Sequence, residues 1–344
     1  DKSFCYMNSL YSIEISSTVE TIGSYFLSNC EKIEKIIVPN GVKNIEESAF
    51  NACTNLKEAE LPVSLQSLGN YAFYYDFSLE NIIVDEASDY FKSKDGVLFN
   101  SNCTSLIRFP ENSSITEYVI PQGVTHIEKC AFNNCIKLKS VKFPDSIIYV
   151  GNSAFSWCTQ LENIEFSGEM DEMDDYCFSV CSSLKNIKWP NKIRRIGDGS
   201  FDGAKISNGD LPSGLEEIGQ GAFERCIELK SVTIPKSVTS MGSFMFEGCE
   251  NISVKGFCGE NIEYSLAPTG KLEIVGYGKM NYVHFSYLGL KIKSISLDDR
   301  ITELSQGVFS QTDISDIDLP SSLIEISDSA FSSCSALNYI DIPS

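Results

Sequence analysis

Apolar residues recur along this chain at a nearly constant interval. A short phrase in which Phe follows Ala repeats at Ala49-Phe50, Ala72-Phe73, Ala131-Phe132, Ala154-Phe155, Ala222-Phe223 and Ala330-Phe331, with variants at Phe4, Phe26, Phe178, Phe201, Phe246 and Phe309. The spacings are 22, 24 and 23 residues from Phe4 to Phe73 and 23, 23, 23, 22 and 23 from Phe132 to Phe246. Self-similarity at such a period indicates a repeat architecture rather than separate globular domains.

Each repeat predicts one short strand. An apolar residue followed by Gly, as in Ile218-Gly219, precedes the Phe, and a Cys and a Leu follow it. In the segment 229–235 the residues Ser231 to Ile234 alternate polar and apolar, which is typical of a strand with one buried face. Pro235 then ends the strand. One such unit cannot bury its own apolar face, so neighbouring units must stack and align their strands in a parallel sheet.

The period breaks twice. Phe73 and Phe132 are 59 residues apart, and Phe246 and Phe309 are 63 residues apart. Within the first break, residues 95–110 read as two apolar strands around a polar turn, which predicts a β-hairpin projecting from a coil.

These features together resemble a known family. The unit Leu-Pro-x-x-Val-x-x-Ile-Gly-x-x-Ala-Phe-x-x-Cys-x-x-Leu, interrupted by Gly-Val-Leu-Phe at 96–99 and Leu-Ile-Arg-Phe-Pro at 106–110, is similar to the BspA-like leucine-rich repeats of mucosal bacteria and parasitic protists. The segment from Cys258 to Met280 resembles that family's non-repeat hairpin module. The chain departs from the family pattern at Tyr282 to Lys291, where a Trp-Tyr pair is common and only Tyr287 remains.

The resemblance covers nearly the whole chain and implies its organisation. It implies a leucine-rich-repeat solenoid with a parallel β-sheet on the concave face, short helical or irregular turns on the convex side, and inserted β-hairpins. We expect a solenoid of about 10–11 coils over residues 1–250 with a hairpin insertion near 85–115, a β-hairpin module over 251–291, and further coils over 292–344. Both ends fall inside the repeat pattern, so we expect a piece of a longer protein.

The resemblance also implies a function. Proteins of this kind bind host extracellular or matrix proteins such as fibronectin, or mediate adhesion, so we expect a non-enzymatic protein-binding scaffold at the cell surface or secreted. An intracellular structural scaffold within a larger complex stays open as the alternative.

Charge and composition narrow the partners. With 27 basic and 47 acidic residues the formal charge is −20, which argues against nucleic acid or an anionic membrane surface as partner. No apolar stretch approaches the roughly 20 residues of a membrane span, so direct membrane insertion of this part of the chain is not expected. The two histidines, His126 and His284, give a nucleophile or proton shuttle little to build on, and we expect no catalytic site and no cofactor.

Cysteine is abundant but follows the repeat. Seven of the 13 cysteines stand three residues after a repeat Phe, and Cys30 and Cys103 stand four after one, which predicts a ladder of nine buried thiols. Cys5, Cys130, Cys177 and Cys258 fall outside it. The paired Cys-x-x-Cys knuckles of a zinc site are missing. The acidic run from Asp171 to Asp175 could attract Ca²⁺, but it lacks the alternating ligands of a calcium loop, so we expect no metal site.

Outward-pointing strand residues are the candidate binding surface. In a solenoid such columns line the concave face, and the candidates are Lys35, Glu58, Glu60, Lys142, Glu165, Lys188, Asp210, Asp316, Asp318 and Tyr339. The projecting hairpins are an alternative contact site. Asn102, Asn112 and Asn251 fit the glycan acceptor pattern, which matters only if a eukaryote secretes the chain.

Overall fold

The structure is a computed structural model that describes residues 1–281 and 283–343, so Tyr282 lies outside the described residues. The chain forms two compact units, Asp1–Asn191 and Lys192–Ser344. Regular structure in both units is almost all β-strand. In the described ranges there is one helix, the short 3-10 turn η1 (Phe285–Leu288).

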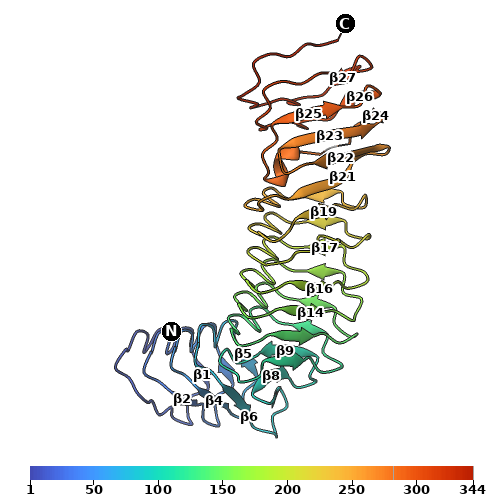
Figure 1. The fold of residues 1–344 in the computed structure, drawn as a ribbon. Helices are drawn as coiled ribbons and strands as arrows, with labels where there is room; N and C mark the ends of the chain where they lie inside the picture. The colour runs from blue at the N-terminus through green and yellow to red at the C-terminus, as the bar shows by residue number, and fades with distance from the viewer. Residues whose placement is uncertain (282, 344) are drawn as a thin grey trace. The chain divides into compact units, whose positions relative to one another are not determined.

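In the first unit, short strands stack in parallel from coil to coil (Figure 1). Its strands are β1 (Thr21–Ile22), β2 (Lys35–Ile37), β3 (Asn44–Ile45), β4 (Glu58–Leu61), β5 (Ser67–Leu68), β6 (Asn81–Val84), β7 (Phe91–Lys94), β8 (Val97–Asn100), β9 (Ser105–Arg108), β10 (Glu117–Val119), β11 (His126–Ile127), β12 (Ser140–Lys142), β13 (Tyr149–Val150), β14 (Asn163–Glu165), β15 (Glu172–Met173) and β16 (Asn186–Lys188). The sheets β1-β3-β5, β2-β4-β6 and β10-β12-β14-β16 are parallel. Strands β7, β8 and β9 are antiparallel, and β9 continues in parallel with β11, β13 and β15.

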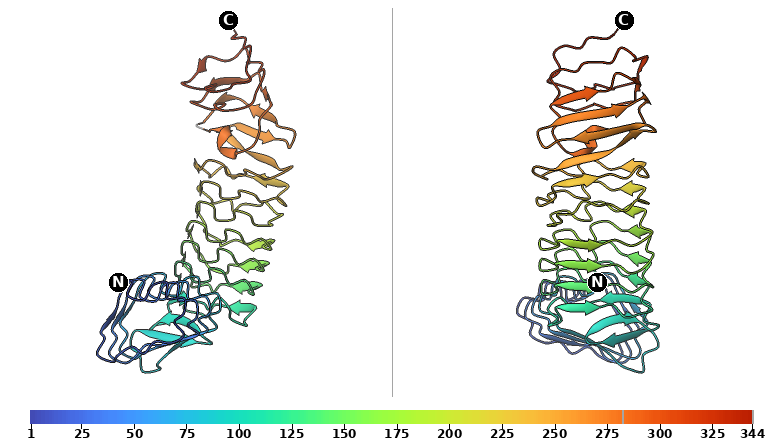
Figure 2. Two further views of the ribbon diagram at one scale, coloured as in Figure 1. Left: turned by 90° about the vertical axis from the view of Figure 1, so that its left-hand side faces the viewer. Right: turned by 45° about the vertical axis from the view of Figure 1, so that its right-hand side comes forward.

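The second unit repeats this plan around a larger irregular insertion (Figure 2). Its strands are β17 (Arg195–Ile196), β18 (Glu217–Ile218), β19 (Ser231–Thr233), β20 (Ser240–Met241), β21 (Ser253–Gly259), β22 (Ile262–Leu266), β23 (Lys271–Gly276), β24 (Gly278–Lys279), β25 (Ser294–Leu297), β26 (Ile301–Leu304) and β27 (Glu325–Ile326). Strands β17, β18 and β20 are parallel, as are β24, β26 and β27. Between β19 and β25, the strands β21, β22 and β23 run antiparallel.

The predicted parallel-strand solenoid with inserted antiparallel strands is thereby confirmed, with one difference. A regular coil contains two strands, whereas the sequence predicted one. The second strand has only two residues and lies at the Ile-Gly phrase, as in β3, where Ile45 is buried and pairs with Ile22 of the coil before. Two residues are too few for an alternating pattern to be visible in the sequence.

The glycine of that phrase is required by close stacking. A Cβ on Gly69 would lie 2.4 Å from the backbone carbon of Glu46, and one on Gly242 would lie 2.2 Å from the backbone nitrogen of Gln220. Neighbouring coils therefore approach each other closely at this point, and a side chain there would collide with backbone.

Phenylalanine rings stacked from coil to coil form the centre of the core. Ring centroids of Phe132 and Phe155 are 4.5 Å apart and those of Phe155 and Phe178 are 5.1 Å apart, with nearly parallel planes. All three side chains are fully buried. We call this column the rung column, since each coil contributes one residue to it.

The structure corrects the register of the rung column near the N-terminus. Leu27, rather than Phe26, is the rung, because Leu27 is fully buried and its N–H donates to Ala49 as the Phe50 N–H does to Ala72. Phe26 is only partly buried and lies beside Phe4. The spacing is then constant at 23 residues from Phe4 through Leu27, Phe50 and Phe73. A repeat pattern defined by Phe alone does not reveal that Leu27 occupies this position.

The two long breaks also contain rungs that the sequence did not predict. Phe109 stacks on Phe132 with centroids 4.9 Å apart, and Phe285 stacks on Phe309 at 5.9 Å. Both rings are fully buried. Each irregular segment therefore returns to the column before the regular coils resume.

Two residues in each regular coil have left-handed backbone conformation. They stand two residues before and two residues after the rung, as Ser48 (φ 55°) and Ala52 (φ 59°) do around Phe50. Their N–H groups donate to the next coil: Ser48 to Asn70 and Ala52 to Tyr74. The uncommon conformation thus directs a backbone donor at the neighbouring coil, although it costs an L-residue about 1–2 kcal/mol.

Candidate protein-binding surfaces

The three-residue and four-residue strands place the predicted candidates at their outward positions. In β2 and β14 only the middle residue is buried, and Lys35, Glu58, Glu60, Lys142 and Glu165 flank such a residue. Lys188 flanks Ile187, which is only partly buried. The candidates of the second unit, Asp210, Asp316, Asp318 and Tyr339, are exposed but lie outside the named strands. Asp210 and Asp318 take part in isolated parallel bridges with Thr233 and Asp341.

Several of these charges pair with each other across coils. Lys35 Nζ is 2.6 Å from Glu58 Oε1 and 2.5 Å from Glu60 Oε1. Lys188 Nζ is 2.9 Å from Glu165 Oε1. The hydrogen bonds that Lys35 donates to Glu58 and Glu60 raise the pKa of Lys35, and the hydrogen bond that Lys188 donates lowers the pKa of Glu165. The exposed charges of the strand face are therefore partly neutralised by pairs between coils, which the residue types alone do not reveal.

The same face carries two exposed apolar side chains. Ile37 of β2 and Ile83 of β6 are 56% and 43% exposed. In the parallel register both are aligned with Glu60 of the intervening strand. They lie in the outward columns of the sequence pattern but are not charged, so they were not singled out as candidates. We call Ile37, Ile83 and the Lys35–Glu58–Glu60 cluster the β2-β4-β6 patch.

The predicted glycan acceptors differ in accessibility. Asn102 is exposed in the turn between β8 and β9, and Asn251 is exposed with φ 60°. Asn112 is partly buried, and its Nδ2 donates to Glu80 Oε1 at 3.2 Å. The structure thus leaves Asn102 and Asn251 as the open acceptors.

Most of the thiol ladder lies where the sequence placed it. Each of its cysteines donates its Sγ–H to the backbone carbonyl of the rung of the preceding coil, for example Cys158 to Phe132 at 3.0 Å and Cys181 to Phe155 at 3.1 Å. Cys30 belongs to it and bonds Phe4 at 2.9 Å. These bonds explain why a small donor is needed three residues after the rung.

The expectation of nine buried thiols was wrong at two of them. Cys103 is exposed in the β8–β9 turn, since the Phe99 before it is a hairpin residue and not a rung. Cys334 is only partly buried. Cys130, Cys177 and Cys258, for which the repeat made no prediction, are buried.

The acidic run near β15 is part of the coil. Met173 is buried and pairs with Val150, and the Asp174 carboxylate accepts from the Tyr149 hydroxyl at 2.8 Å and from the Asp175 N–H. Among residues 1–281 and 283–343, three His, Cys, Asp or Glu side chains nowhere converge as metal ligands would.

An aromatic cluster lies on the turns of the fourth coil. The rings of Tyr71 and Tyr74 are 5.4 Å apart, those of Tyr74 and Tyr75 are 3.9 Å apart, and those of Tyr75 and Phe77 are 5.7 Å apart. Tyr71 and Tyr75 stand at the two left-handed positions of their coil, which turn their side chains outward.

Beneath this cluster the thiol ladder is interrupted by buried charge. Asp76 stands where a coil would have its Cys, is fully buried, and accepts the Cys53 N–H at 2.8 Å. The Arg108 guanidinium donates to the Glu111 carboxylate and to the Cys130 carbonyl. Burial raises the pKa of Asp76 well above its usual value, with the Glu111 charge adding to the effect. Burial also raises the pKa of Glu111 to about 7, although Arg108 and the Tyr75 N–H oppose the shift. The sequence did not predict this cluster. Its one visible sign is Asp76, which takes the position three residues after Phe73 where other repeats have Cys.

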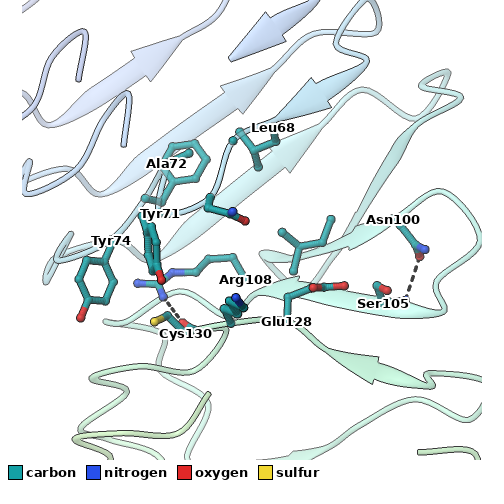
Figure 3. A pocket seen from close by; sticks show the side chains of 14 residues that line it. Leu68, Tyr71, Ala72, Tyr74, Asn100, Ser105, Arg108, Glu128 and Cys130 are labelled. Carbon is teal, nitrogen blue, oxygen red and sulfur yellow. Dashed lines mark hydrogen bonds between the residues drawn. The ribbon is translucent and has the colours of Figure 1, made fainter. Parts of the chain in front are cut away.

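A cavity of about 350 Å³ adjoins this charged group. Figure 3 shows Leu68, Tyr71 and Ala72 on one side, Glu128 and Cys130 on the other, and Arg108 between them. Asn100 and Ser105 close the cavity at the hairpin. All of these residues belong to the first compact unit.

The comparison with protein families agrees with the repeat pattern. A family described as "BspA type Leucine rich repeat region (6 copies)" matches residues 1–107, 107–211, 196–261 and 280–344. The chain belongs to the BspA-type leucine-rich-repeat family. None of the curated proteins compared with the chain matches it.

Solved structures of other proteins have a similar fold. A leucine-rich-repeat protein from Bacteroides ovatus is 25% identical with a TM-score of 0.58, over 94% of this chain and 76% of that one. The pneumococcal vaccine antigen PcpA is 20% identical with a TM-score of 0.53, over 91% of this chain and 65% of PcpA, so the chain spans less than two thirds of that protein.

Family membership sets the coarse function. Leucine-rich-repeat proteins are typically protein-binding scaffolds, and they are generally non-enzymatic. No helix in the described part of this BspA-type chain is long and apolar enough to cross a membrane.

Proposed function

We propose that this BspA-type chain is a cell-surface adhesion module that binds a host or extracellular-matrix protein through its strand face. The observation that carries the proposal is the β2-β4-β6 patch, in which two half-exposed isoleucines flank a cross-coil ion cluster. Apolar anchors surrounded by polar groups are the usual composition of a protein interface.

The apolar and the charged side chains of the patch would contribute differently to binding. Burying an aliphatic side chain contributes about 1.5–3 kcal/mol, so Ile37 and Ile83 would supply affinity. The Lys35, Glu58 and Glu60 charges would instead select a partner whose charges can replace or extend the existing pairs. A chain with a net charge of −20 associates most readily with a basic surface.

The family resemblance makes fibronectin the first partner to test. We expect the whole chain to bind immobilised fibronectin, and we expect Ile37→Asp with Ile83→Asp to weaken that binding about tenfold or more. The control is Ile136→Asp with Ile148→Asp, two exposed isoleucines of the same unit outside the strands. Equal affinities for the two double variants would exclude the β2-β4-β6 patch.

The acidic positions of the second unit give an independent check. Reversing Asp316 and Asp318 to Lys should change the salt dependence of binding if that part of the strand face also contacts the partner. An unchanged salt dependence would restrict the interface to the first unit.

An intracellular scaffold is the second candidate, and the thiols favour it. No disulfide joins cysteines in the described ranges, as is usual in reducing compartments. Antibody staining of source cells with and without permeabilisation separates the two. Staining of intact cells supports the adhesion module, whereas staining only after permeabilisation supports the scaffold.

A further inference from the structure

Backbone hydrogen bonds between successive coils follow one scheme in the first unit. Between the second and third coils, the Lys43 and Glu46 N–H groups donate back to the carbonyls of Glu20 and Ile22, at 2.8 and 2.9 Å. In the other direction, Tyr25 and Leu27 N–H groups donate forward to the carbonyls of Glu47 and Ala49, at 3.1 and 2.8 Å. These bonds give each coil two acceptors and two donors that face the coil after it, and a third donor follows at Asn29, whose N–H donates to the Asn51 carbonyl at 2.9 Å.

The next coil boundary repeats the scheme unchanged. Gln66 and Gly69 donate back to Lys43 and Ile45, both at 2.7 Å, and Ser48 and Phe50 donate forward to Asn70 and Ala72, both at 3.0 Å. The scheme therefore predicts which groups the coil of β5 should offer in turn. They are the carbonyls of Gln66 and Leu68 and the N–H groups of Tyr71 and Phe73.

At this coil the scheme stops. The chain goes on into β6 and then into the antiparallel strands β7 and β8, and β5 pairs only with β3. Over residues 1–281 and 283–343, the four groups of Gln66, Leu68, Tyr71 and Phe73 make none of the expected bonds. We call these four groups the open edge.

The side chains around the open edge also lack their usual cover. Ile22 and Ile45 are buried, but Leu68, the next residue in that column, is only partly buried. Tyr71 keeps the left-handed conformation, φ 59°, that in other coils directs the N–H at the following coil. The edge therefore retains the geometry of a coil that has a neighbour.

The cavity of about 350 Å³ lies along this edge. Residues 68–74 line it without interruption, and Ile107, Glu128 and Lys129 line it from the other side (Figure 3). Its volume is at the lower end of the range for ligand pockets, which admits a narrow, extended ligand. Arg108 also lines the cavity and connects its two walls, because its guanidinium donates to the Cys130 carbonyl and to Glu111, which accepts from the Tyr75 N–H.

We propose that the open edge binds a peptide segment of another protein, which runs parallel to β5 and then turns, as the following coil does elsewhere. The ligand's N–H groups meet the Gln66 and Leu68 carbonyls, and its carbonyls meet the Tyr71 and Phe73 N–H groups. An apolar side chain of the peptide covers Leu68 and reaches Ile107. This is β-augmentation, in which backbone bonds give affinity and alternate side chains give selectivity.

A peptide backbone fits this site better than other ligand classes do. Two acceptors at β5 followed by two donors in the turn after it are the complement of a peptide chain, and a sheet edge with unpaired groups is a template for it. The inference does not depend on the proposed adhesion function, because the open edge and the β2-β4-β6 patch share no residue.

The chain itself supplies a probe. Residues 43–50, Lys-Asn-Ile-Glu-Glu-Ser-Ala-Phe, make the full set of bonds to the preceding coil in the folded chain. We expect the blocked synthetic peptide of this sequence to bind the whole 344-residue chain with 1:1 stoichiometry in isothermal titration calorimetry.

Two N-methylated peptides test the bonding scheme on the unaltered protein. N-methylation at the position of Glu46 removes a donor that faces the edge and should weaken binding about tenfold or more. N-methylation at the position of Phe50 removes a donor that faces the opposite way and should leave the affinity within about threefold. Equal losses, or no binding of the parent peptide at about 1 mM, would overturn the proposal.

A pair of protein variants tests the location. Leu68→Lys should abolish peptide binding, whereas Ile83→Lys, on the β2-β4-β6 patch, should leave it unchanged while weakening adhesion. Peptide binding that survives Leu68→Lys would place the peptide elsewhere. If Leu68→Lys does not fold, as judged by circular dichroism, the N-methylated peptides decide the question alone.

Discussion

Removing Arg108 tests whether the buried charge cluster stabilises the point where the hairpin interrupts the solenoid. The side chains of Arg108 and Glu111 are 7% and 1% exposed, and Asp76 is fully buried beside them. The substitution Arg108→Met keeps the apolar stem and deletes the charge that opposes both carboxylates. It also leaves the Cys130 carbonyl without its donor.

The size of the effect depends on pH. A carboxyl whose pKa is raised in the folded state stabilises the fold fully below its unfolded pKa, and this stability is lost as pH rises through the folded pKa. For Glu111 the window runs from about 4.5 to about 7, which corresponds to about 3 kcal/mol. Without Arg108 both carboxyls resist ionisation further, so the loss extends above pH 7.

The expected costs follow. At pH 8, breaking a buried ion pair by removing one partner costs about 3–5 kcal/mol. At pH 5 the carboxyls are largely protonated in the fold, so the cost falls to the lost hydrogen bond of Cys130, about 1–2 kcal/mol. The difference between the two pH values, rather than either value alone, is the signature of buried carboxylates.

Urea unfolding followed by circular dichroism at pH 5 and pH 8 measures both costs. Adding Glu111→Gln to Arg108→Met should recover much of the loss at pH 8. Arg225→Met is the control, because Arg225 pairs with Asp202 but is 60% exposed, and an exposed pair contributes less than about 1 kcal/mol. A loss for Arg108→Met that is the same at both pH values would refute the reasoning.

Three further predictions concern the core. Cys103, the exposed thiol, should react first with a maleimide in mass spectrometry of the native chain, and the ten buried thiols only after denaturant is added, because the fold shields them from the reagent. Burial also raises the pKa of Cys249 to about 11. Phe155→Ala should cost about 3–5 kcal/mol in urea unfolding, since its ring stacks on two others, and Phe155→Leu much less. Leu27→Ala should cost about 2–5 kcal/mol and more than Phe26→Ala, because Leu27 is the rung; the reverse order would restore the register read from the sequence.

The repeat was predictable because stacking requires a large apolar residue, most often Phe, at the same place in every coil. Phe132, Phe155 and Phe178 are therefore recognisable by their constant spacing, and a Cys stands three residues after each of them. Leu27 escaped because any large apolar side chain satisfies the column. Phe109 and Phe285 escaped because the insertions before them change the spacing while the column in space continues.

The candidate surfaces were only partly predictable for a different reason. Period-two alternation identifies outward positions, so Lys35 and Glu60 were found, but pairing across coils depends on register, which the sequence gives only after the coils are aligned. The open edge could not be found at all from residue types, because it consists of backbone groups of Gln66, Leu68, Tyr71 and Phe73. The open edge exists because no coil pairs with β5 on the side away from β3.

The paired left-handed residues make unravelling of this solenoid directional. Each coil holds two residues, such as Ser48 and Ala52, in a conformation that costs about 1–2 kcal/mol apiece, and the bonds that offset this cost go to the coil after it. When a coil detaches, the left-handed residues of the coil before it lose the carbonyl acceptors that offset the cost of their conformation. The left-handed residues of the coil after it keep their acceptors, which lie in the next coil along. Unfolding should therefore spread from a detached coil toward the N-terminus more readily than toward the C-terminus.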